Sequence, residues 1–63
     1  MKLTLREWRR LKEITQAQMA EVCGVTPATY QAWEKKPSEI KISVAIKIAE
    51  RLGITLDDLV LEP

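Results

Sequence analysis

Few side chains in this chain could carry out covalent chemistry. The sequence has no His and a single Cys, Cys23, which leaves no Ser–His or Cys–His pair, no internal disulfide and no basis for a zinc site. It also lacks a Gly-rich phosphate loop and paired buried carboxylates. We therefore expect no enzyme activity, metal ion, cofactor or small-molecule ligand, and we interpret Cys23 as a small buried apolar residue.

Residues 16–35, QAQMAEVCGVTPATYQAWEK, instead favour non-covalent recognition by an exposed helix. Gly24 can adopt the positive φ that ends a helix, Thr26 is a good N-cap, and Pro27 suits the first helical position. Ala20 is small enough for two helices to approach closely. These features predict two short helices joined by a tight turn. The second would present its outer face at a width that fits a DNA major groove.

Capping signals divide the rest of the chain into similar short helices. Four of the expected helices follow a Thr, and two are followed by a Gly. We predict an all-α fold, a compact five-helix bundle, as a single domain over residues 1–63. The helices are expected over residues 5–12, from 16 to the glycine at 24, and over 27–35, 42–52 and 56–60.

Several local expectations follow from this pattern. Leu5, Trp8 and Leu11 are expected to form the inward stripe of the first helix. Residues 37–41 are predicted to be the only loop, and residues 42–52 to form a mostly buried helix that lacks a polar N-cap. The alternative is that Ser43 is the N-cap, which would shorten this helix by a residue or two. No range has the alternation of a strand.

The aromatic residues admit two interpretations. Trp8, Tyr30 and Trp33 could stack on single-stranded nucleic acid. Their helical spacing with other apolar residues favours core packing instead.

The net charge of the 63 residues is only +1, but the charge is unevenly distributed. Residues 1–36 hold seven Lys or Arg and four Asp or Glu, whereas residues 37–63 hold three and five. A polarised domain can present one basic face, so we expect a dimer or a short nucleic-acid footprint. The chain shows neither a signal peptide nor a membrane-spanning run, which favours a cytoplasmic location without membrane partners.

Three stretches resemble a known family. They are RRLKEITQAQMAEVCG from Arg9, VTPATYQAWE from Val25 and IKIAERLGITLDDL from Ile46. The chain resembles the Cro/repressor-type helix-turn-helix domains, also called the xenobiotic response element family and typified by the lambdoid phage repressors. The resemblance implies a lambda repressor-like bundle in which the second and third helices form the helix-turn-helix. It also implies a homodimer that binds double-stranded operator DNA.

The resemblance assigns the recognition residues. Pro27, Ala28 and Ala32 occupy positions that face base edges, with Gln31 close by, and Gln16 would contact a phosphate and brace the next helix. The family often has Gln, Ser or Arg at these positions. Ala can meet a thymine methyl group and Gln can pair with adenine, so we predict weak direct readout that relies on DNA shape.

The same resemblance assigns contacts to the DNA backbone. Thr26 and Thr29 would bind phosphates, and Lys35, Lys36 and the loop to Lys41 would lie along the other strand. The family usually has a Gly soon after this helix, and its replacement by Lys-Lys-Pro leaves the loop conformation open.

Other charged residues have structural interpretations. Arg9 and Glu34 match a pair that forms a salt bridge between the first and third helices in the family, and the alternative is two solvated charges. Arg6, Arg10 and Lys12 are interpreted by default as a solvated helix face. The apolar residues Val60 and Leu61 could be a loose tail or a small two-fold interface.

Two functions of different classes remain open. The first is a sequence-specific DNA-binding transcriptional regulator. The length favours a stand-alone Cro-like regulator or an antitoxin-like binder, with an isolated domain of a longer repressor as the alternative. The second is a protein-interaction module or antagonist that uses the same fold to bind a regulator, which the low net charge and the apolar face support.

Overall fold

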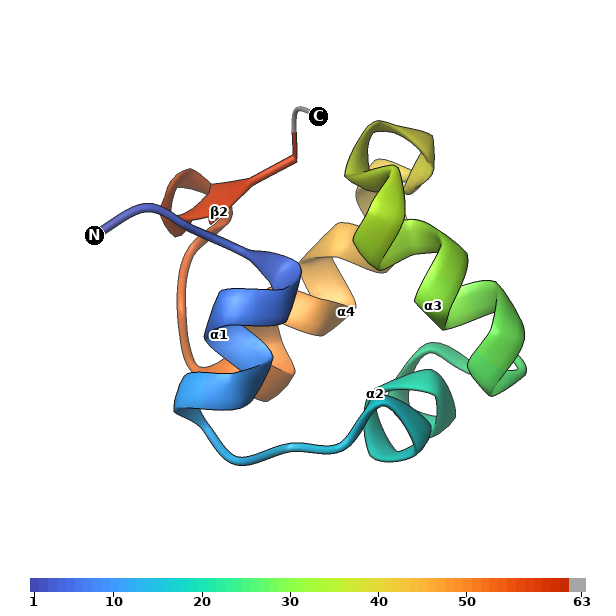
Figure 1. Ribbon diagram of the computed structural model, residues 1–63. Helices are drawn as coiled ribbons and strands as arrows, with labels where there is room; N and C mark the ends of the chain where they lie inside the picture. The colour runs from blue at the N-terminus through green and yellow to red at the C-terminus, as the bar shows by residue number, and fades with distance from the viewer. Residues whose placement is uncertain (62–63) are drawn as a thin grey trace.

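The computed structural model describes residues 1–61, a mainly helical chain folded around one core (Figure 1). The last two residues of the expected domain 1–63 lie outside the described residues. The α-helices are α1 (Leu5–Leu11), α2 (Gln16–Cys23), α3 (Pro27–Lys35) and α4 (Ile42–Leu52). The short elements are the 3-10 helices η1 (Pro37–Glu39) and η2 (Leu56–Asp58), and the strands β1 (Leu3–Thr4) and β2 (Leu59–Val60).

Local capping explains where the helices begin. The backbone N–H of Glu7 donates to the Thr4 hydroxyl over 3.2 Å, and the Thr4 N–H donates to the Glu7 carboxylate over 2.9 Å. Thr15 and Gln18 repeat this reciprocal capping box at the start of α2. Helix α4 starts after Lys41 with no side-chain cap, as predicted. The predicted starts of all four helices are therefore confirmed.

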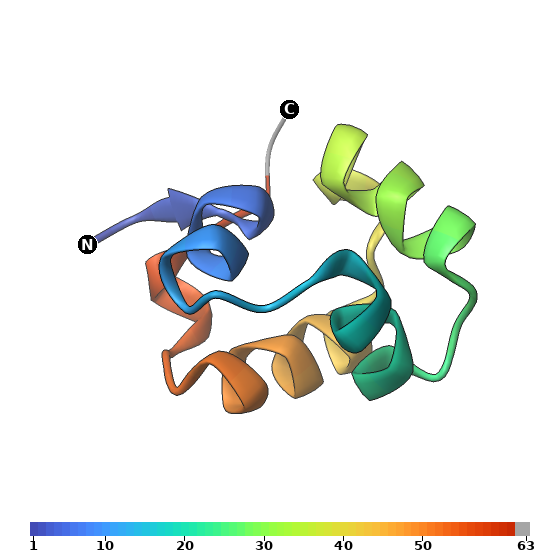
Figure 2. The same cartoon turned by 60° about the horizontal axis from the view of Figure 1, so that its bottom comes forward.

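The core is formed by side chains from all four α-helices, including the fully buried Met19 of α2, and α4 lies below α1 in Figure 2. Trp8 is buried, and its indole N–H donates to the backbone carbonyl of Asp58 over 2.8 Å. Tyr30 is fully buried and meets the half-buried Trp33 edge to face, with ring centroids 6.4 Å apart. Core packing is thus the correct interpretation for Trp8 and Tyr30, which leaves neither ring free to stack on bases.

The prediction of a fifth helix over residues 56–60 is wrong, and the fold is not wholly α-helical. After Thr55 the chain forms only the three-residue η2, although the predicted capping pair between Thr55 and Asp58 is present. The chain then extends as β2, where Leu59 and Val60 pair in parallel with Leu3 and Thr4. A capping box marks where a helix begins, and here the strand pairing ends it after one turn.

Three local predictions are also wrong. Helix α4 is not mostly buried, because it packs on the core through one face only and leaves Ile42 and Ile46 63% and 43% exposed. Leu11 is 57% exposed rather than inward, because positions three residues apart fall about 60° short of a full helical turn at each step. Two such steps rotate Leu11 away from the face that buries Leu5. The predicted loop at residues 37–41 contains η1, whose first residue, Pro37, is buried.

Candidate nucleic-acid interface

Helices α2 and α3 are joined by a turn whose backbone leaves little freedom. Gly24 has φ +71°, in the left-handed region. The N–H of Val25 donates to the Ala20 carbonyl over 3.0 Å, and the N–H of Gly24 donates to the Glu21 carbonyl over 3.1 Å. These two bonds form a Schellman motif, which fixes the direction in which the chain leaves α2 and enters α3.

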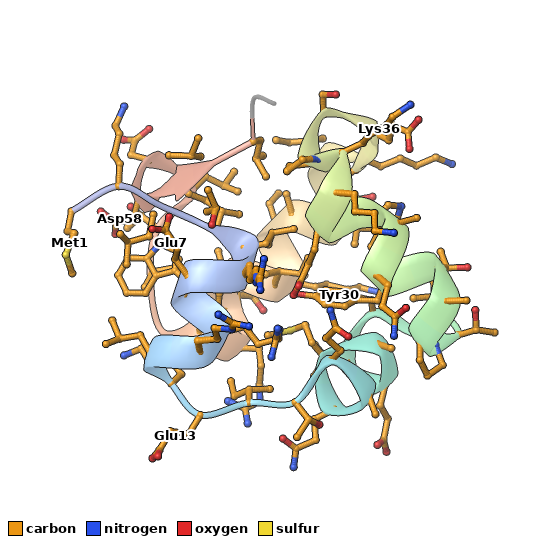
Figure 3. All side chains as sticks on the ribbon, viewed as in Figure 1. Met1, Glu7, Glu13, Tyr30, Lys36 and Asp58 are labelled. Carbon is orange, nitrogen blue, oxygen red and sulfur yellow. The ribbon has the colours of Figure 1, made fainter. Side chains whose placement is uncertain are left out.

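Helix α3 lies at the outer edge of the molecule, on the side away from β1 and β2 (Figures 1 and 2). Tyr30 points from this helix into the interior (Figure 3). The opposite face is exposed and carries few hydrogen-bonding groups. It consists of the sequence-predicted residues Pro27, Ala28, Gln31, Ala32 and Lys35.

The predicted phosphate-binding residues at the two ends of α3 are exposed as well. Thr26 caps the helix, with its hydroxyl accepting from the Thr29 N–H over 3.3 Å and donating to the Thr29 hydroxyl over 3.1 Å. Lys36 lies at the other end of α3, beside η1 (Figure 3). The N-terminal end of α3 therefore offers hydroxyl groups, and its C-terminal end offers an ammonium group.

The structure brings Arg9, Glu34 and Gln16 together behind this exposed face. The Arg9 Nε lies 2.6 Å from Glu34 Oε2, and the Arg9 Nη2 donates to Glu34 Oε1 over 3.3 Å. The remaining guanidinium nitrogen, Nη1, donates to the Ile14 carbonyl over 2.9 Å. The amide of Gln16 donates to Glu34 Oε1 over 3.0 Å. Residues from α1, α2 and α3 thus share one carboxylate, which fixes α3 relative to the other two helices.

Burial and hydrogen bonding act in opposite directions on this carboxylate. Burial alone would raise the pKa of Glu34, but hydrogen bonds from Arg9 and Gln16 outweigh it and hold the pKa below its usual value. Burial is the main cause that raises the pKa of the Tyr30 phenol, and the neighbouring Glu34 carboxylate raises it further. Among residues 1–61 the Tyr30 hydroxyl has no hydrogen-bond partner. Glu34 is therefore an ionised carboxylate and Tyr30 a neutral phenol at neutral pH.

A cleft of about 400 Å³ opens between α1 and α3, and we call it the basic cleft. Four of its seven lining side chains are cationic and one is a carboxylate. It is lined by Arg6, Arg9, Arg10, Gln16, Gln31, Glu34 and Lys35.

Arg6 and Arg10 line this cleft, but the site predicted from the sequence does not include them. The sequence pattern places both arginines on a solvated helix face. Their spacing of four residues shows that they share a face of α1, but nothing in the sequence shows that this face borders α3.

Three features of the described residues bear on functions other than nucleic-acid binding. Cys23 is half-buried, not buried as expected, and burial raises the pKa of its thiol, which disfavours the reactive thiolate. No group of three or more His, Cys, Asp or Glu side chains within residues 1–61 could hold a metal ion. Nor is any helix in that range long and apolar enough to span a membrane.

A family model described as helix-turn-helix matches residues 5–59, which include all four α-helices. The chain belongs to this helix-turn-helix family. An uncharacterized HTH-type transcriptional regulator of Methanocaldococcus jannaschii is 34% identical over 59 residues, which cover 94% of this chain and 89% of that protein. No solved structure gives a significant match. The resemblance to Cro/repressor-type helix-turn-helix domains is thereby confirmed.

Proposed function

We propose that this helix-turn-helix protein is a sequence-specific regulator that binds double-stranded DNA and places α3 in the major groove. The supporting observation is that α3 is fixed on its inner side by Tyr30 and Glu34, and exposes Ala28 and Ala32 on its outer side. Small side chains on a rigidly held helix allow its backbone to approach base edges closely. The HTH-type transcriptional regulator to which the chain is similar supports the same function.

The residues divide into base-facing and phosphate-facing groups. Ala28 and Ala32 contact thymine methyl groups, and Gln31 is the side chain able to donate and accept hydrogen bonds at an adenine edge. Pro27, at the first position of α3, also faces base edges. The remaining residues bind phosphates of the DNA backbone. They are Gln16, Thr26, Thr29, Lys35 and Lys36.

Sequence preference in this mode of binding comes largely from DNA shape. Pro27 and the two alanines on α3 have no side-chain hydrogen-bonding group, so they distinguish bases only through methyl contacts. Positions in the operator that the protein does not touch would then still affect affinity, through groove width and flexibility. We expect a modest ratio of specific to non-specific affinity.

The regulator acts by occupying DNA, without catalysis. A homodimer would read two half-sites about 34 Å apart, one helical turn. We further propose that residues 1–63 form one domain and that the protein works in the cytoplasm. The half-buried residues Val60 and Leu61 are candidates for the two-fold contact.

Selection of bound duplexes from random DNA tests this function. We expect enrichment of a short site with two related halves, and a steep loss of affinity as salt rises, because each neutralised phosphate adds about 0.9 to the slope of log affinity against log salt. If selection at low salt enriches no sequence, the regulator is excluded. The alternative, a protein-interaction module, would then be favoured by the exposed apolar face of α3.

A further inference from the structure

We propose that the basic cleft seats one phosphate of the DNA backbone, held by Arg6 and Arg10 of α1 together with Lys35 of α3. This inference rests on the DNA-binding function proposed above and adds α1 to the DNA-contacting surface. It assigns a ligand to two arginines that sequence patterns place on a solvated face.

The positions of the three cations support a shared ligand. Arg6 and Arg10 lie one helical turn apart on α1, and both line the cleft from the same side. Lys35 lines it from α3. All three side chains are exposed, so an anion can reach them without any rearrangement of the core.

The charge balance of the cleft also favours an anion. Glu34, its one carboxylate, is already neutralised by Arg9. Within residues 1–61, Arg6, Arg10 and Lys35 take part in no salt bridge. Like charges one turn apart on a helix repel each other, and an anion between them removes this repulsion. Guanidinium groups match phosphate oxygens in a planar, two-pronged geometry, so a phosphate suits this cluster well.

The DNA backbone is the phosphate source that the position of the cleft favours. A helix in the major groove has a sugar–phosphate strand on each side. Lys36 and η1 lie beyond the C-terminal end of α3. Gln31 and Lys35 instead form one wall of the cleft, which lies between α3 and α1. Seating α3 in the groove therefore brings the mouth of the cleft toward one strand. A free phosphate compound offers the same chemistry, and competition distinguishes it from DNA.

A matched pair of double variants tests the proposal. Arg6→Gln/Arg10→Gln removes two charges one turn apart from the cleft. Lys47→Gln/Arg51→Gln removes two exposed charges at the same spacing from α4, which does not line the cleft. With the duplex enriched by the wild-type protein, we expect the cleft variant to lower the salt slope by about 1 for each bound protomer, and the control to leave it unchanged.

Phosphate ethylation of the same duplex provides a readout that a purely structural role would not change. Ethylation removes the charge of one phosphate at a time. We expect the wild type to be sensitive to one more phosphate per half-site than the cleft variant, with the base preference of both proteins unchanged. Identical interference patterns and salt slopes for wild type and cleft variant would overturn the proposal while leaving the DNA-binding function intact.

Two further outcomes separate the remaining possibilities. If the wild type enriches no duplex, the proposed function fails, and this inference fails with it. If inorganic pyrophosphate binds the free protein through Arg6 and Arg10 more tightly than the duplex does, the cleft is a site for a free phosphate compound and the assignment to the DNA backbone is wrong. Weak competition by pyrophosphate, at concentrations far above those of the duplex, supports the assignment.

Discussion

The Nε of Arg9 and the Oε2 of Glu34 lie 2.6 Å apart and join α1 to α3. The two side chains are only 11% and 5% exposed. Gln16 donates to the same carboxylate from the first residue of α2. The helix proposed to read DNA is thus held in place by a polar cluster on its buried side, and its orientation depends on that cluster remaining intact.

Replacing Glu34 by Gln should destabilise the fold strongly. The change leaves the Arg9 guanidinium buried without a counter-charge, which costs about 3 kcal/mol in comparable pairs. Urea denaturation measures the loss in the free energy of unfolding. Glu21→Gln serves as the control, because Glu21 is exposed on α2 and a surface change of this kind stays within about 0.5 kcal/mol.

Removing both charges should restore much of that stability. In Arg9→Met/Glu34→Leu, apolar side chains of similar size replace the pair, and no buried charge is left unpaired. We expect the double variant to be more stable than Glu34→Gln by urea denaturation. If it is equally unstable, the cost of Glu34→Gln does not arise from an unpaired charge.

The protein should lose stability in acid, partly through Glu34. Its pKa in the folded state lies below the usual value of 4.5, so the folded state binds fewer protons than the unfolded state at mildly acidic pH. The stabilisation is complete above the unfolded pKa and is lost as the pH falls through the folded pKa. Hydrogen bonds from the Thr4 and Thr55 backbones lower the pKa values of Glu7 and Asp58 in the same direction.

Unfolding free energies measured from about pH 6 downward test this dependence. The wild type should become less stable as the pH falls below about 5, and Glu34→Gln should show a shallower decline. A wild-type profile that is flat over this range, or one parallel to that of Glu34→Gln, would be inconsistent with a paired carboxylate at position 34.

Glu13→Gly should stabilise the protein. Glu13 follows the end of α1 with φ +57°, a conformation that costs a residue with a side chain about 1 kcal/mol or more and costs glycine little. Its side chain points away from the molecule (Figure 3), so truncation removes no packing. Allowing for the greater freedom of glycine in the unfolded chain, we expect a net gain of about 0.5 kcal/mol.

The gain from Glu13→Gly should appear as a higher urea midpoint. Glu13→Ala is the matched control, because it removes the same side chain but keeps the steric cost of positive φ. Equal midpoints for the Gly and Ala variants would show that backbone strain is not the cause.

Local signals in the sequence predict the helix starts and the turn well. Thr4, Thr15 and Thr26 cap helices through contacts within three residues, so the chain itself contains the whole interaction. Gly24 and Gly53 both take positive φ at helix ends, as their residue type indicates. The family resemblance then correctly pairs Arg9 with Glu34, a contact that no local pattern contains.

Two kinds of structural feature cannot be predicted in this way. One depends on contacts between residues far apart in the sequence, and the other is a backbone conformation that the residue type does not indicate. The two-residue strands β1 and β2 are too short for any alternation, and they exist because the ends of the chain meet. Glu13 adopts positive φ although its type gives no such signal. The basic cleft requires the packing of α1 against α3, so Arg6 and Arg10 look like ordinary solvated residues until the fold is known.

The affinity of Ala32→Asp for the duplex that the wild type enriches tests the docking of α3 most directly. Ala32→Glu repeats the test with a residue that favours helices more, in case Asp perturbs α3. Arg51→Gln on α4 makes the same change in net charge and serves as the control. A negative charge at position 32 would face the DNA, so both variants should fold with unchanged helix content and lose specific binding, while Arg51→Gln still binds. A folded Ala32→Asp or Ala32→Glu protein that binds this duplex with wild-type affinity would contradict the placement of α3 in the major groove.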